Sequence, residues 1–122
     1  MINFERLNVY QEAVLLTTDI YKLTKKYPKD ELFGLVGQMR RAAVSVPLNI
    51  AEGSSRTKKD FRHFLTMAVG SCYELVALYK VSLELGLLSK QEYDKLYVST
   101  SDLAKRINAL RKSMNHERMT MN

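Results

Sequence analysis

The sequence has few of the features of disulfide-bonded, secreted or membrane-spanning proteins. Cys72 is the only cysteine, so no disulfide can form within the chain, which fits either a reducing compartment or a position in the core. No uninterrupted apolar run approaches about 18 residues, and residues 1–6 lack the basic region and apolar run of a secretory signal peptide. We therefore expect a soluble, cytoplasmic protein that does not bind a membrane.

Residue patterns of enzymes are also lacking. Metal sites in helical bundles use two Glu-x-x-His motifs. Here Asp60 and His63 form a single carboxylate–histidine pair at this spacing, no second such pair exists, and His116 lies near the C-terminus. Cys72 has no histidine three or four residues away, and Ser45 has no obvious base beside it. The five glycines match no phosphate-binding G-x-x-x-x-G-K loop. We expect no enzymatic activity, no metal and no cofactor.

What the sequence does contain is helical periodicity. Apolar residues recur at steps of three and four through four segments, and there is no alternating pattern typical of strands. The segments predict helices over residues 6–27, 28–52, 57–86 and 89–114, followed by a frayed tail over 115–122. Helices of this length joined by short turns predict one all-α domain over residues 1–122, an up-down-up-down antiparallel four-helix bundle.

Individual residues mark the ends of these helices. Pro28 ends the first helix and can begin the second, because the residue before a proline is pushed out of the helical region. Thr57 with Asp60 resembles a cap at the start of the third helix. Ser89 with Glu92 is a capping box for the fourth.

Two helices carry a second apolar row beside the main one. The rows are Val9, Leu16 and Leu23 in the first helix, and Val69, Val76 and Leu83 in the third. They widen the apolar face beyond one seam between neighbouring helices. We expect this surplus to pack against another copy of the chain in an oligomer.

The second helix combines an interior proline with a polar stripe. The stripe consists of Gln38, Arg41, Ser45, Asn49 and Glu52, beside the core row. We interpret it as a structural polar network, in which Arg41 reaches Glu74 on the third helix. Ser45 and Asn49 satisfy the carbonyl that Pro47 leaves without its usual donor. The alternative is a ligand site formed by Arg41, Ser45, Asn49 and Glu52.

The net charge of +6 is concentrated in two places. Residues 38–63 hold six basic and two acidic side chains, and residues 101–122 hold five and two. Such asymmetry favours a polyanionic partner such as RNA or DNA. The candidate nucleic-acid-binding residues, at the start of the third helix, are Arg56, Lys58, Lys59 and Arg62. The alternative is that they only solubilise a turn. Another basic group either extends this cluster or forms a separate face: Lys105, Arg106, Arg111 and Lys112.

The segment Gln38-Met-Arg-Arg-Ala-Ala-Val-Ser-Val-Pro-Leu-Asn-Ile-Ala-Glu-Gly53 resembles a motif of a known family, the bacterial four-helix bundle proteins. This group includes proteins encoded within intervening sequences of 23S ribosomal RNA genes. The flanking segments that also match are residues 4–11, 27–35, 61–65 and 70–75. The resemblance implies a bundle protomer in a closed homopentamer. It also implies kinship in fold to the accessory variability determinant of diversity-generating retroelements, a basic, ring-shaped protein that binds nucleic acid and a reverse transcriptase.

These observations lead to two hypotheses of function. The favoured one is a non-enzymatic, oligomeric protein that binds nucleic acid, RNA more than DNA, through its basic surface residues. The alternative is a protein-protein interaction scaffold with no nucleic-acid role, in which a groove of the bundle receives a helix of a protein partner.

Overall fold

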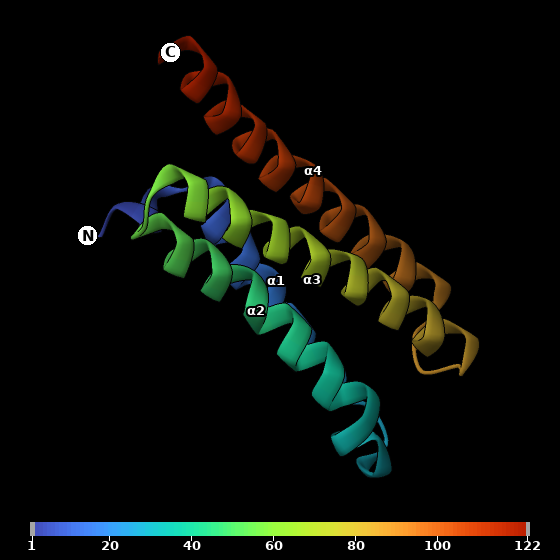
Figure 1. The fold of residues 1–122 in the computed structure, drawn as a ribbon. Helices are drawn as coiled ribbons and strands as arrows, with labels where there is room; N and C mark the ends of the chain where they lie inside the picture. The colour runs from blue at the N-terminus through green and yellow to red at the C-terminus, as the bar shows by residue number, and fades with distance from the viewer. Residues whose placement is uncertain (1, 122) are drawn as a thin grey trace.

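The computed structural model describes the backbone of residues 2–121 and the side chains of residues 2–114. The four long helices are α1 (Asn8–Thr24), α2 (Gly37–Ser54), α3 (Lys58–Glu84) and α4 (Lys90–Met121). Consecutive helices run in opposite directions and pack side by side as an antiparallel bundle (Figure 1). The described residues contain no strand, which confirms the predicted all-helical class. Short helical turns, η1 (Asn3–Arg6), η2 (Lys29–Glu31) and η3 (Leu32–Val36), precede α1 and α2.

The core consists of the apolar rows that the sequence pattern predicts. Each helix contributes buried side chains at steps of three and four, and α3 packs against both α2 and α4. The largest fully buried apolar side chains are Ile20, Met39, Ile50, Leu65, Leu75, Leu103 and Ile107. Burial of one such side chain stabilises the fold by about 1.5–3 kcal/mol. The Tyr79 hydroxyl, also buried, forms a 2.9 Å hydrogen bond with that of Thr100 and so joins α3 to α4.

The second apolar rows belong to this core. On α1, Val9 and Leu16 are buried and Leu23 packs against the core. On α3, Val69 is buried and Val76 packs against the core. A helix in a four-helix bundle contacts two neighbours, so its apolar face is wider than one seam. The interpretation of these rows as a surplus for another subunit was therefore wrong.

The connection between α1 and α2 differs from the predicted continuous helix. Residues 29–31 form a 3₁₀ turn and residues 32–36 a π-helical turn, and regular α-helix begins only at Gly37. The break is at Gly34, whose φ of −106° and ψ of −111° are not helical. The Glu31 carboxylate holds the break by accepting the Leu35 N–H at 3.5 Å. The prediction of a helix from Pro28 was wrong because it ignored the freedom of this glycine.

The predicted caps are present. Ser89 and Glu92 form a reciprocal capping box: the Glu92 N–H donates to Ser89 Oγ at 3.1 Å, and the Ser89 N–H donates to the Glu92 carboxylate at 3.0 Å. Thr57 Oγ1 accepts the Asp60 N–H at 3.2 Å.

At its C-terminal end α4 continues to Met121, past the predicted end near residue 114. Residues 115–121 contain neither proline nor glycine, so no residue there breaks a helix.

Helix α3 is long and apolar enough to cross a membrane by length and composition alone. Its buried residues, which include Leu65, Cys72 and Tyr79, lie in the core shared with the other helices. Of its most apolar window, 39% is buried in the structure, and one such helix is weak evidence for a membrane span.

Candidate nucleic-acid interface

The turn between α2 and α3 depends on Gly53. This residue is buried, and a Cβ atom built on it would lie 2.6 Å from Cβ of Phe64 and 2.9 Å from the Phe61 ring. Only glycine lets the end of α2 approach α3 so closely. Residues 56–62, which hold the basic cluster, directly follow this tightly packed end of α2.

The four predicted nucleic-acid-binding residues lie at the start of α3. Arg56, Lys58 and Lys59 are exposed and Arg62 is half-buried. The first turn of α3 also presents the positive end of the helix dipole, which favours an anion. Two carboxylates, Glu52 and Asp60, lie in the same stretch, so the local excess is two positive charges.

Arg56 is held in place by its neighbours. Its Nη2 donates to the Glu52 carboxylate at 2.6 Å, and its guanidinium carbon lies 5.2 Å from the centre of the Phe64 ring. The hydrogen bond to Glu52 raises the pKa of Arg56 above its ordinary value. Phe64 is an aromatic side chain in contact with the cluster, a combination that the sequence pattern did not reveal.

The second basic group divides between two faces. Arg106 forms an ion pair with Glu12 on α1 and lies 3.7 Å from Asp102 on its own helix. Lys105 instead lines a groove between α3 and α4. Arg111 is half-buried, and Lys112 is exposed. Because Arg106 is paired with carboxylates, it contributes little to a cationic surface. Lys105 lies on the side of α4 that faces α3.

The polar stripe on α2 does not form the predicted network. Arg41 and Glu74 are both exposed and form no ion pair in the part of the chain whose side chains are described. Glu52 pairs with Arg56 rather than with the stripe. Two long side chains on neighbouring helices can reach one another, but in water such a pair gains little. The predicted pairing of Arg41 with Glu74 was wrong.

The shorter polar residues of the stripe form local hydrogen bonds. Ser45 Oγ donates to the Ala42 carbonyl at 2.9 Å and contacts Ser71 Oγ on α3. Asn49 Nδ2 donates to the Ser45 carbonyl at 2.8 Å. None of these bonds reaches the Ala43 carbonyl, which loses its donor because Pro47 has no N–H. The predicted role of Ser45 and Asn49 at that carbonyl was therefore wrong.

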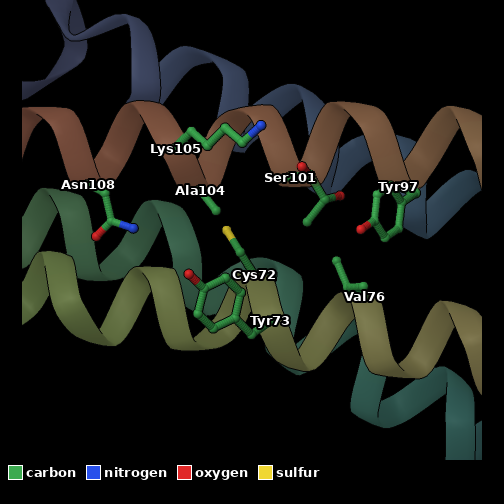
Figure 2. A pocket seen from close by; sticks show the side chains of 9 residues that line it. Cys72, Tyr73, Val76, Tyr97, Ser101, Ala104, Lys105 and Asn108 are labelled. Atoms are coloured by element: carbon green, nitrogen blue, oxygen red, sulfur yellow. The ribbon is translucent and has the colours of Figure 1, made fainter.

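A groove between α3 and α4 carries exposed tyrosines that the sequence analysis did not single out as functional. Tyr73 on α3 is 62% exposed and Tyr97 on α4 is 44% exposed. Both line a cavity of about 250 Å³, together with Cys72, Val76, Thr100, Ser101, Ala104, Lys105 and Asn108 (Figure 2). Tyr97 lies within the segment 89–114, whose apolar periodicity predicts a helix but does not show which of its aromatic residues stay exposed. Two tyrosines beside core rows of adjacent helices were the signal available in the sequence.

The described side chains contain no cluster of three or more histidine, cysteine or acidic residues able to hold a metal ion. Cys72 is fully buried, and burial raises the pKa of its thiol to about 12. A thiol of this kind is protonated at neutral pH and is a poor nucleophile. The interface thus consists of cations, tyrosines and hydroxyl groups.

The fold and its basic turn define a four-helix bundle protein with a cationic end. Residues 5–109 match the family model of the 23S rRNA-intervening sequence protein, and the chain belongs to this family. A similar fold occurs in a protein of unknown function from the S23 ribosomal protein family of Bacteroides thetaiotaomicron, whose crystal structure superposes with a TM-score of 0.79. The two sequences are 18% identical, and the match covers 85% of this chain and 98% of that chain. No curated protein matches the sequence.

Proposed function

We propose that this protein is a non-enzymatic, oligomeric nucleic-acid-binding protein that prefers RNA. The observation that carries the proposal is the gathering of Lys58, Lys59 and Arg62 around the start of α3, beside Arg56, which is paired with Glu52, and next to the close packing at Gly53. Lysine and arginine side chains at a helix N-terminus neutralise phosphates and release counterions. The family description refers to an intervening sequence of 23S rRNA, which favours RNA over DNA as the partner.

Substitution of two lysines tests this proposal. In Lys58→Gln/Lys59→Gln we expect the plot of log affinity for single-stranded RNA against log salt concentration to become shallower by about 0.7 for each lost phosphate contact. The control is Lys22→Gln/Lys25→Gln on α1, which removes the same charge from exposed lysines far along the chain. An unchanged slope in the first variant, or an equal change in the control, contradicts the assignment.

We further propose that the protein is a homo-oligomer, with a pentamer favoured by its family resemblance. Leu15 on α1 is 64% exposed and Val98 on α4 is 66% exposed, so each of these helices leaves an apolar side chain in contact with water, where a second copy of the chain can cover it. Light scattering at micromolar concentration should give about five times the mass of one chain. A monomeric mass contradicts the proposed assembly. The RNA-binding test does not depend on this result.

A scaffold role is the second candidate because Phe33, in the connection before α2, is 93% exposed and Leu32 beside it is 47% exposed. Exposed apolar side chains at a protruding turn are typical of protein-binding surfaces. Affinity purification distinguishes the two roles. Recovery of a protein partner that is lost with Phe33→Ala, without any RNA at low salt, favours the scaffold.

A further inference from the structure

We propose that the groove between α3 and α4 binds unpaired nucleobases, so that the partner is single-stranded rather than duplex nucleic acid. This inference rests on the proposed nucleic-acid-binding function and assigns it a second contact region. The groove presents Tyr73 on one wall and Tyr97 on the other (Figure 2). Tyrosine rings bind bases by stacking, and every base has a face that can stack.

The groove has the size and chemistry of a site for one base. Its volume of about 250 Å³ is slightly below the usual range for drug-sized ligands. Cys72, Val76 and Ala104 give it an apolar floor. Ser101 and Asn108 on α4 add groups that can donate or accept hydrogen bonds. An apolar floor with a few polar groups at the rim suits a flat aromatic ring with polar edges.

Tyr97 lies beside a second tyrosine of α4, Tyr93. The centres of the Tyr93 and Tyr97 rings lie 5.9 Å apart, with an angle of 35° between their planes. The ammonium groups of Lys80 and Lys90 lie 6.0 and 5.4 Å from the centre of the Tyr93 ring. Lys80 and Lys90 are themselves paired with Glu84 and Asp94 and add little net charge, so Tyr97 belongs to a larger aromatic surface rather than a cationic one.

Charge separates this groove from the neighbouring one. The groove between α3 and α4 is lined by Lys105 and by no carboxylate among the described residues. The groove between α1 and α4, in contrast, is lined by Glu12, Asp19 and Asp102. Arg106 pairs with Glu12 and lies near Asp102, but the three carboxylates still outnumber it, so a polyanion is favoured in the first groove over the second. Lys105 favours an anionic occupant of the α3/α4 groove, and the two exposed tyrosines favour one that carries flat bases, as a nucleic acid does.

The groove leads toward the basic turn. Because α3 and α4 are antiparallel, residues of α4 beyond Asn108 run toward the start of α3 (Figure 1). Arg111 follows Asn108 by three residues, on the same side of the helix. Nε of Arg111 and Nη1 of Arg62 are buried N–H donors without an acceptor within the described part of the protein. These two buried N–H groups are closed to a phosphate, but both arginines are only half-buried, so their other guanidinium N–H groups can donate to the phosphates of a strand that leaves the groove.

The test measures the affinity of single-stranded RNA for aromatic variants. With a fluorescent ten-residue oligouridine, we expect Tyr73→Ala and Tyr97→Ala each to raise Kd roughly 5- to 150-fold, the range of one lost base–aromatic stack. Tyr73→Phe keeps the ring and should bind as the unaltered protein does. Phe33→Ala removes an exposed aromatic side chain outside the groove and serves as the matched control.

The salt dependence separates stacking from phosphate contact. The tyrosine variants should keep the slope of log affinity against log salt, because a neutral ring releases no counterions. A duplex of the same length should bind more weakly than the single strand. Crosslinking with 5-iodouridine RNA, followed by peptide mapping, should label Tyr73 or Tyr97.

The failures of the two proposals are distinguishable. If the unaltered protein binds no RNA at low salt, the proposed function fails and the groove proposal fails with it. If it binds RNA and the tyrosine variants keep its Kd, the function stands and the groove proposal is overturned. Loss of assembly in the tyrosine variants with unchanged affinity assigns the groove to contact between copies and also overturns it. Melting curves of each variant verify that the bundle is folded.

Discussion

Thr17 on α1 donates a hydrogen bond to the Ala43 carbonyl on α2, with 3.1 Å between Oγ1 and the oxygen. This carbonyl is the one that Pro47, four residues later, leaves without a donor. Thr17 also donates to the Ala13 carbonyl of its own helix at 2.8 Å, so one hydroxyl is shared between two acceptors. The proline inside α2 is therefore compensated from a neighbouring helix, which couples the packing of α1 to the proline-containing segment of α2.

Thr17→Val removes this donor while keeping the shape of the side chain. We expect the free energy of unfolding to fall by about 1–3 kcal/mol, because the Ala43 carbonyl is left unsatisfied. Urea denaturation measures the change. Thr18→Val is the matched control, since Thr18 is exposed and bonds only within its own helix, to the Leu15 carbonyl. Equal losses in the two variants contradict the role of Thr17.

Gly53→Ala tests the close approach at the basic turn. The added methyl group would overlap Phe64, so we expect a loss of about 1–3 kcal/mol from overpacking. Gly70→Ala, on an exposed part of α3 with no atom within 4 Å of the new Cβ, should instead stabilise by about 0.5–1 kcal/mol. Thermal melting compares the two. A Gly53 variant as stable as the unaltered protein shows that the turn is not tightly packed.

The elements that the sequence predicted well are those decided by local chemistry. The capping box of Ser89 and Glu92 needs only two residues three positions apart, and the structure confirms it. The apolar rows are equally local, because burial of residues such as Ile50 and Leu65 follows from the period of the helix. The same holds for the position of the basic cluster, which is fixed by the cap at Thr57.

Apart from the local break at Gly34 and the C-terminal end of α4, the features that were missed depend on relations between helices. Ser45 and Asn49 lie nearest to Pro47 in sequence, yet the donor comes from Thr17, 26 residues before Ala43. No periodicity within one helix identifies such a partner. The exposed tyrosines of the α3/α4 groove were missed for the same reason, because the groove exists only when both helices are in place.

Acid should weaken the contact between the end of α1 and the start of α4. The Glu92 carboxylate accepts from Lys26 Nζ at 2.6 Å, and this hydrogen bond, with that from the Ser89 N–H, lowers the pKa of Glu92 below 4.5. Because the pKa of Glu92 is lower in the folded than in the unfolded protein, the ionised carboxylate stabilises the fold at pH values above its ordinary pKa. This stabilisation is lost as the pH falls through the lowered pKa.

Glu92→Gln should therefore destabilise the protein at pH 7, and the difference from the unaltered protein should shrink as the pH falls below about 4.5. Urea midpoints at pH 7 and pH 3 measure it. Glu84→Gln, which loses only an exposed 3.7 Å pair with Lys80, should have little effect at either pH. A difference that stays constant with pH contradicts the role of the Glu92 charge.

Cys72 should react slowly with thiol reagents in the folded protein. Its side chain is fully buried, so a reagent cannot reach it, and the pKa of its thiol is raised to about 12, so little thiolate is present at pH 8. Labelling with iodoacetamide should require urea and should follow the unfolding curve. Rapid labelling without denaturant shows that the floor of the α3/α4 groove opens in the native state.

The central claim is that this bundle binds RNA through the basic start of α3. Its most direct test is a titration of the unaltered protein with fluorescent single-stranded RNA at a series of salt concentrations. We predict saturable binding at low salt, with log affinity falling linearly as log salt rises, at about 0.7 for each phosphate contacted. An RNA that stays unbound at the lowest salt, with the protein folded and in excess, contradicts the account.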